Sequence, residues 1–157
     1  MGNYDSLELQ GSAREEAIGR IHKQMREWGL AMPDTTPLLL HFGLDRFAEF
    51  GEAEFWIANE EQHGYCGKLL FLFGGQTCPE HYHIRKHETF FVVKGTVEMR
   101  IGGAHRAMGI GDVLPVPPGA AHSFTGVGNA LVLEVSQPSV LNDNFFSDPC
   151  IGKNGVI

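Results

Sequence analysis

Short apolar runs separated by polar and turn-forming residues make up most of the chain after about residue 50. The runs are rich in branched and aromatic side chains, and Gly or Pro lies between them. They are Glu54–Ala58, Gly67–Phe73, Thr89–Val93, Thr96–Ile101, Val113–Val116, Ala121–Thr125 and Leu131–Val135. Runs of this length and composition predict short strands, and their number predicts an all-β sandwich or barrel.

Two of the predicted strands are apolar at consecutive positions, in Leu69–Phe73 and in Thr89–Val93. A strand with one face in water alternates apolar and polar residues, so these two runs indicate that both faces of the sheet are covered. A jelly roll with an outer layer, to which a second subunit contributes, would explain the pattern. We therefore expect a homodimer.

A helical pattern precedes the strands. Apolar residues recur at near-helical spacing, and they are Ala17, Ile18, Ile21, Met25, Trp28 and Leu30. Ser12 followed by Glu15 matches a capping box, which predicts one helix over about residues 13–29. Pro33 ends the pattern, and Leu38–Phe42 resembles a first strand. We expect residues 1–50 to form a helical extension packed on a barrel of residues 51–157, with the loop-like stretch 138–157 over its mouth.

Length and composition restrict the class of protein. The chain has 157 residues, of which 43% are hydrophobic and 20% charged, and these values are typical of one globular domain. It contains no apolar run of the roughly 20 residues that a membrane helix needs. The start, MGNYDSLELQ, lacks the basic and apolar regions of a signal peptide. These observations predict a cytoplasmic protein without a membrane partner.

Charge and cysteine content exclude two further classes. The net charge is -7, and the chain has no basic cluster beyond Arg85–Lys86, so a surface that binds the phosphates of nucleic acids is not expected. The three cysteines, Cys66, Cys78 and Cys150, are odd in number and form no CxxC pair. Neither a disulfide framework nor a thiolate zinc site is therefore predicted.

The candidate chemistry lies in His81, His83, Glu88 and His122. Residues two apart on an extended strand face the same way, so His81 and His83 can direct their imidazoles at one point. Glu88 can approach from the neighbouring strand, and His122 follows the turn at Pro117–Ala120. Three imidazole nitrogens and one carboxylate suit a single divalent metal ion, with open positions for a substrate. His87 is expected to face outward, and His22, His41, His63 and His105 lack a partner at ligand spacing.

These residues resemble the two motifs of the cupin superfamily. The first motif is Gly, five residues, His-x-His, three or four residues, Glu, six residues, Gly, and it is matched by Gly75, His81, His83, Glu88 and Gly95. The second is Gly, five residues, Pro-x-Gly, two residues, His, and it is matched by Gly111, Pro117, Gly119 and His122. The resemblance covers about residues 65–136. It implies an all-β cupin-type double-stranded β-helix, a jelly-roll barrel, with an N-terminal helical extension.

A narrower resemblance is to the bacterial cupin-type D-lyxose ketol-isomerases. That family has a lysine before the first motif, a Pro-Glu-His entry, a Glu-Thr-Phe after it, a later strand glutamate and a terminal Phe-x-Asp-Pro. The matching residues are Lys68, Glu80 with His81, Glu88–Phe90, Glu134 and Phe146–Pro149. The chain departs from the family because residues 84–87 and 96–110 are compact and Cys150 follows the terminal Asp-Pro. These departures bear on the identity of the substrate.

The resemblance implies an aldose–ketose sugar isomerase that uses one divalent metal ion, with manganese first and iron, zinc, nickel or cobalt as alternatives. The metal would bind the substrate carbonyl and hydroxyl, and the reaction would pass through an enediolate. Glu134 would shuttle the proton and Lys68 would stabilise the developing charge as catalytic residues. Glu80 and Asp148 would bind the monosaccharide substrate.

Other readings remain open at this point. The same ligand set suits a non-haem iron dioxygenase, and a cupin can also bind a small molecule without chemistry. Lys68 and Glu134 could be charges that reach the surface, Asp148 a plain turn residue and Glu80 a charge on the rim. Metal content, oxygen uptake and aldose turnover distinguish these functions.

Overall fold

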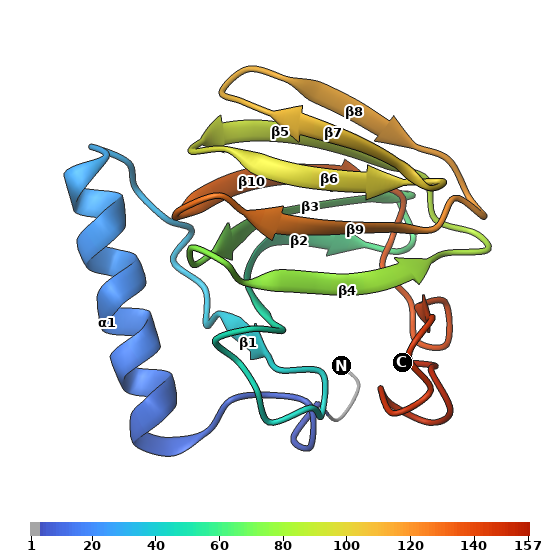
Figure 1. Ribbon diagram of the computed structural model, residues 1–157, viewed down its shortest axis with the longest axis horizontal. Coiled ribbons are helices and arrows are strands. Elements are labelled where there is room, and N and C mark those ends of the chain that lie inside the picture. The colour runs from blue at the N-terminus through green and yellow to red at the C-terminus, as the bar shows by residue number, and fades with distance from the viewer. Residues whose placement is uncertain (1–3) are drawn as a thin grey trace.

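Two antiparallel sheets form a barrel-like sandwich in the computed structural model, which describes residues 4–157 (Figure 1). The first sheet has the strand order β1 (Leu38–Leu40), β2 (Glu52–Glu60), β3 (Tyr65–Leu72), β10 (Ala130–Ser136), β5 (Glu88–Lys94) and β8 (Val113–Val116). The second has the order β11 (Phe145–Phe146), β4 (Thr77–Tyr82), β9 (His122–Gly126), β6 (Val97–Ile101) and β7 (Ala104–Met108). Strands β10 and β9 lie between strands that are distant in sequence, as in a jelly roll. The predicted fold class is confirmed.

Alternation along the strands places the core between the two sheets. Leu70, Phe90 and Val132 from the first sheet pack against Met99 and Phe124 from the second, and all of them are buried. Gly95 connects β5 to β6 with a φ of 77°, and a Cβ atom there would collide with the carbonyl oxygen of Asn129. The tight connection therefore requires glycine at this motif position.

Helix α1 (Gly11–Glu27) covers part of the outer face of the first sheet. Its buried residues Ala17, Ile21 and Met25 pack in one cluster with Phe55 of β2 and Phe71 of β3. The helix therefore accounts for part of the two-sided apolar pattern of the strands. The predicted capping box is wrong, because Gln10 is the N-cap, no side chain caps the helix and Ser12 lies within it.

The remaining outer face carries an apolar strip that is partly exposed. Leu69, Leu133, Phe91 and Val113 lie opposite one another on β3, β10, β5 and β8. Phe91 is 37% exposed and Val113 is 50% exposed, and Val135 beside them is 49% exposed. We call these five residues the outer strip. The homodimer stays a prediction, and the outer strip is the surface through which two copies would pack.

Strand β4 contains one extra residue relative to its partner β9. Cys78 pairs with Phe124 and His81 pairs with His122, so three positions on β4 span two positions on β9. This bulge lets both Cys78 and His81 face the interior. Three strands, β4, β7 and β11, were absent from the predicted runs, although His81 and His83 were expected on an extended strand, and β11 lies in the stretch that was expected to be a loop.

Strand β1 belongs to the predicted extension and yet pairs with β2 of the barrel. The division into residues 1–50 and 51–157 stays a prediction. In the described part of the chain, no helix is long and apolar enough to cross a membrane. The cytoplasmic location also stays a prediction.

Candidate active site

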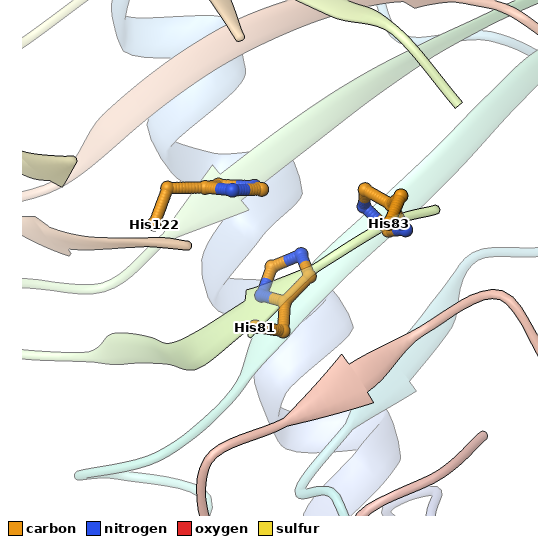
Figure 2. A group of neighbouring side chains, drawn as sticks. All are labelled: His81, His83 and His122. Carbon is orange, nitrogen blue, oxygen red and sulfur yellow. The ribbon is translucent and has the colours of Figure 1, made fainter. Parts of the chain in front are cut away.

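Three histidines converge inside the barrel. His81 lies on β4, His83 follows the end of that strand, and His122 begins β9 opposite His81. All three are buried, and one ring nitrogen from each lies within 4.8 Å of the others. Figure 2 shows the three rings pointing toward a common space. Among the described residues, these histidines form a group that could hold a metal ion.

Backbone carbonyl groups orient the three rings. Each Nδ1 lies against a carbonyl oxygen, which is that of Pro79 for His81 (2.8 Å), of Asp143 for His83 (2.7 Å) and of Ala120 for His122 (2.9 Å). Because a carbonyl oxygen only accepts hydrogen bonds, each Nδ1 carries the hydrogen and each Nε2 carries the lone pair. Within residues 4–157, Nε2 of His83 and Nε2 of His122 have no hydrogen-bond partner.

These observations fit a metal ion. Burial and the neighbouring His122 and His83 hold the pKa of His81 well below its ordinary value, so the ring is neutral, the form that binds metals. Buried ring nitrogens without partners are costly unless a ligand satisfies them. The orphaned nitrogens and the fixed ring orientations therefore suit a divalent ion, which would satisfy them.

Glu88, at the start of β5, faces the same space. Its Oε1 lies 3.2 Å from Nε2 of His83, and its Oε2 lies 3.1 Å from Nε2 of His122. The group of ligand atoms that lie within 4.8 Å of one another comes from the three histidines and does not include Glu88. Its role as the fourth ligand stays a prediction, and the carboxylate is in contact with two of the predicted ligands.

Alternating charges continue from Glu88 along the cavity wall. Lys86 Nζ lies 2.7 Å from Glu88 and 3.2 Å from Glu134, and Lys68 Nζ lies 3.4 Å from Glu134 and 2.7 Å from Glu54. All five side chains are buried. We call Glu88, Lys86, Glu134, Lys68 and Glu54 the charged chain. Each buried charge in it has at least one opposite partner, which is the condition under which ion pairs survive in an interior.

The pKa values follow from these contacts. Burial alone would lower the pKa of Lys68, but Glu134, Glu54 and Glu52 outweigh burial and hold it well above its ordinary value. Burial likewise opposes the charge of Lys86, whose pKa is nevertheless raised, chiefly by Glu134. Burial would raise the pKa of Glu54, but the ammonium group of Lys68 lowers it below its ordinary value. Both lysines and Glu54 are therefore charged at neutral pH.

His81, His83 and the charged chain line one small cavity. Its volume is about 50 Å³, so it suits a small polar molecule or one that displaces side chains at the mouth. Leu70, Phe90 and Phe124 form apolar parts of the wall. Tyr4 and the C-terminal segment border the cavity, and the residues that contribute from that segment are Ser139, Asn144, Phe146 and Ile157. The predicted position of residues 138–157 over the barrel mouth agrees with this lining.

The structure brings some predicted site residues together and separates others. Lys68 and Glu134 are buried in the cavity wall beside the histidines, and neither reaches the surface. Glu80 is exposed, and its carboxylate accepts a hydrogen bond of 2.7 Å from Ser147. Asp148 is also exposed and accepts a hydrogen bond of 2.9 Å from the backbone N–H of Cys150 in a turn. Neither is among the residues that line the cavity, and their substrate-binding role stays a prediction.

Sequence reasoning missed Lys86, Glu54 and Asp143. Lys86 looked like half of a surface basic pair, and Glu54 looked like the end of a strand. One available signal was parity, since Glu52, Glu54 and Trp56 alternate with the apolar Ala53 and Phe55 on a strand expected to be covered on both faces. Asp143 carried no signal, because its partners are 57 to 59 positions away.

Comparison with known proteins agrees with this geometry. The sequence pattern of the cupin domain matches residues 69–136. A D-lyxose ketol-isomerase from Cohnella laeviribosi is 30% identical over 183 aligned positions, which cover 95% of this chain and 98% of that protein. A D-lyxose ketol-isomerase from Thermofilum sp. (strain ex4484_79) is 29% identical, over 90% of this chain and 93% of its own.

Solved structures share the fold over most of the chain. The L-ribose isomerase of Cellulomonas parahominis, solved with L-ribose, matches with a TM-score of 0.70 at 18% identity, over 90% of this chain and 93% of its own. An L-ribose isomerase of Acinetobacter sp. DL28 matches with a TM-score of 0.72 at 15% identity, over 90% and 94%. Taken with the motifs and the sequence relatives, these findings place the chain in the cupin superfamily, in the same family as the D-lyxose ketol-isomerases.

Proposed function

We propose that this protein is a metal-dependent aldose–ketose isomerase that acts on a monosaccharide, with D-lyxose as the first substrate to test. One observation carries the proposal: the carboxylate of Glu134 lies between two ammonium groups in the cavity that His81 and His83 also line. A sugar isomerase needs a proton-transferring group and charge stabilisation beside a metal-binding site. The relatives named D-lyxose ketol-isomerase support the choice of reaction.

His81, His83 and His122 would hold the metal ion, with Glu88 as the fourth ligand. Manganese is the proposed ion, and iron, zinc, nickel and cobalt suit the same donors. A divalent ion bound there supplies a Lewis acid that polarises a substrate carbonyl group. The carbonyl groups of Pro79, Asp143 and Ala120 keep the three rings in position by accepting their Nδ1 hydrogens.

The side chains of the charged chain would carry out the proton transfer. Glu134 accepts the proton from one substrate carbon and returns it to the neighbouring carbon. Lys68 and Lys86 flank Glu134 and would stabilise the negative charge that develops on the substrate oxygens. The surrounding apolar wall excludes water, which strengthens these electrostatic interactions.

The first test is metal content of the purified protein, followed by turnover of D-lyxose and D-mannose with added manganese. We expect ketose formation that a chelator abolishes and that falls at least about a hundredfold in Glu134→Gln, since general acid–base groups contribute that much. Glu98→Gln, at a partly exposed position on β6, is the matched control and should retain activity. Activity in Glu134→Gln equal to that of the control would remove Glu134 from the mechanism. Bound iron with oxygen consumption and no ketose would instead favour a dioxygenase.

A further inference from the structure

Glu52 is a buried carboxyl group that the proposed reaction does not use. It begins β2, is 5% exposed and lines the same cavity as His81 and His83. Glu52, Glu54 and Trp56 alternate with Ala53 and Phe55, which pack toward the helix, so Glu52 faces the interior of the barrel. In the described part of the chain, its Oε2 has no hydrogen-bond partner.

The neighbours of Glu52 determine its protonation state. Burial, and then the negative charge of Glu54, raise the pKa of Glu52 well above its ordinary value, although Lys68 opposes the shift. The two carboxyl groups are close enough to share a proton, and the Cys78 thiol is also within hydrogen-bonding reach of Glu52. Glu54 keeps its charge because Lys68 binds its Oε1 at 2.7 Å and Trp56 Nε1 donates to its Oε2 at 2.9 Å. The surroundings of Glu52 therefore favour its uncharged carboxylic acid form, beside the carboxylate of Glu54.

The contacts place Glu52 away from the reacting groups and inside the same cavity. Glu54 and Lys68 separate it from Glu134 along the charged chain. On the other side, Cys78 lies between Glu52 and His81, with 3.9 Å between Cys78 Sγ and His81 Nδ1. A molecule that fills the cavity therefore meets His81, His83 and Glu134 at one region of its surface and Glu52 at another.

An uncharged carboxyl group can donate one hydrogen bond and accept others, which matches the chemistry of a hydroxyl group. A buried oxygen without a partner is unfavourable, so a ligand hydroxyl that pairs with it gains affinity and a ligand without that hydroxyl does not. An isomerisation occupies only two adjacent carbons of a sugar, and the other carbons carry hydroxyl groups.

We propose that Glu52 is a substrate-binding residue that holds a sugar hydroxyl on a carbon other than the two that react. This inference rests on the proposed function for the identity of the ligand as a monosaccharide. It makes Glu52 a specificity residue, since it would discriminate between sugars by one hydroxyl and would leave the chemical step itself unaffected.

The test compares wild type, Glu52→Gln and Glu52→Leu with D-lyxose and with analogues that lack the hydroxyl on carbon 3, 4 or 5. Binding is measured by calorimetric titration of manganese-loaded protein, and KM and kcat are measured alongside. The Leu substitution should weaken binding of D-lyxose and raise KM about tenfold, which corresponds to roughly 1.4 kcal/mol, with kcat within a few-fold of wild type. The Gln substitution should retain most of the affinity, since an amide also donates and accepts. Glu60→Gln, at an exposed position on the same strand, is the control.

One analogue identifies the contact. Wild type should bind the analogue that lacks the partner hydroxyl about tenfold more weakly than D-lyxose, and Glu52→Leu should bind both equally. An equal loss for every analogue, or unchanged affinity in Glu52→Leu, would overturn the assignment. Thermal melting of each variant separates loss of binding from loss of folding, and the Gln variant provides the conservative comparison. The titration needs no turnover, so sugar binding without ketose formation rejects the isomerase and still tests Glu52, whereas no binding of any sugar by wild type rejects both.

Discussion

At the scale of single residues, Glu52 and Glu54 show how neighbours decide the state of one functional group. The two carboxyl groups lie on the same face of β2, two positions apart, and both are buried. Glu54 is bound by the ammonium of Lys68 and stays charged, while Glu52 is next to that negative charge and keeps its proton. The contact with Lys68 therefore lowers the pKa of Glu54, whereas the pKa of Glu52, next to the charge of Glu54, is raised.

This difference predicts a pH-dependent effect of Glu52→Gln on stability. Because the pKa of Glu52 is raised in the folded state, the folded protein retains a proton that the unfolded chain releases above about pH 4.3. Stability contributed by the protonated form is therefore lost as the pH rises toward the folded-state pKa. An amide has no proton to release, so the variant should melt at a higher temperature than wild type at about pH 8, and the difference should shrink toward about pH 5. Thermal melting of chelator-treated proteins measures it, and a difference that is independent of pH contradicts the assigned protonation state.

Lys68→Met tests the charged chain as a source of stability. Removal of the ammonium leaves Glu54 and Glu134 buried without that partner, and breaking a buried pair costs about 3 to 5 kcal/mol. Urea unfolding should show a loss of this size in the free energy of unfolding. Lys23→Met removes an ammonium that is 74% exposed in a surface pair and should change the free energy by less than about 1 kcal/mol. If the two variants are equally stable, the charged chain does not stabilise the sheet.

The sequence predicts the metal-ligand residues better than the groups that surround them. His81 and His83 follow from strand periodicity and motif spacing, and both depend on residues near each other in the chain. Lys86 meets Glu134 across 48 positions, and its neighbours Arg85 and His87 are both exposed. Parity with Glu88 correctly places His87 outward, but no local pattern reveals that Lys86 meets Glu134, because the contact joins segments that are far apart in the sequence.

At the scale of elements, Asp143 connects the C-terminal segment to the loop after β4. Its carboxylate accepts hydrogen bonds from the backbone N–H groups of Ile84, Arg85 and Lys86, and its carbonyl oxygen accepts the Nδ1 hydrogen of His83. The loop carries His83 at one end and Lys86 at the other. One residue of the terminal segment thus orients a predicted metal ligand and the lysine beside the proposed base.

Asp143→Ala should therefore weaken metal binding without removing a ligand. The variant keeps the carbonyl oxygen that accepts from His83, but it loses the carboxylate that fixes the loop through three backbone N–H groups, so His83 is held less firmly. Loss of such support around a metal ligand typically lowers metal affinity 10- to 100-fold. Competition with a chromogenic chelator measures the affinity for manganese, and Asp143→Asn, which keeps an acceptor oxygen, should restore part of it. Leu141→Ala, at a 50% exposed position in the same segment, should have no effect. Equal affinities in Asp143→Ala and Leu141→Ala would show that the loop keeps His83 in place on its own.

The boundaries of the strands show which strands the local sequence pattern could predict. The strands from β2 to β10 that carry strong apolar runs agree with their predicted ranges to within a few residues. The strand β7 (Ala104–Met108) contains His105 and Arg106 and has exposed side chains at four of its five positions, so hydrophobicity could not reveal it. Its pairing with β6 through the turn at Gly102 and Gly103 supplies the hydrogen bonds that make it a strand.

At the scale of the whole molecule, the outer surface of the first sheet is divided. Helix α1 covers Phe55 and Phe71, and the outer strip of Leu69, Leu133, Phe91, Val113 and Val135 continues beyond it across four strands. The strip contains no charged residue. An uncharged apolar patch matches a second copy of itself under a two-fold rotation without like-charge repulsion.

We therefore expect a homodimer through the outer strip. Phe91→Lys places a charge at its centre and should convert the dimer to a monomer, which light scattering coupled to size-exclusion chromatography measures. Val127→Lys alters a residue that is 62% exposed in the connection between β9 and β10, outside the strip, and should leave the dimer intact. A monomeric wild type, or a dimer that survives Phe91→Lys, contradicts this assignment of the interface.

The extra residue in β4 has a further consequence for how such barrels change during evolution. It shifts the phase of the strand, so that Cys78 and His81 both face inward although an uninterrupted strand would turn them to opposite sides. Deletion of one residue between them would restore regular pairing and leave them two positions apart, which also places both on the inner face. The bulge therefore allows this strand to differ by one residue in length while the interior that holds the cysteine and the histidine is preserved.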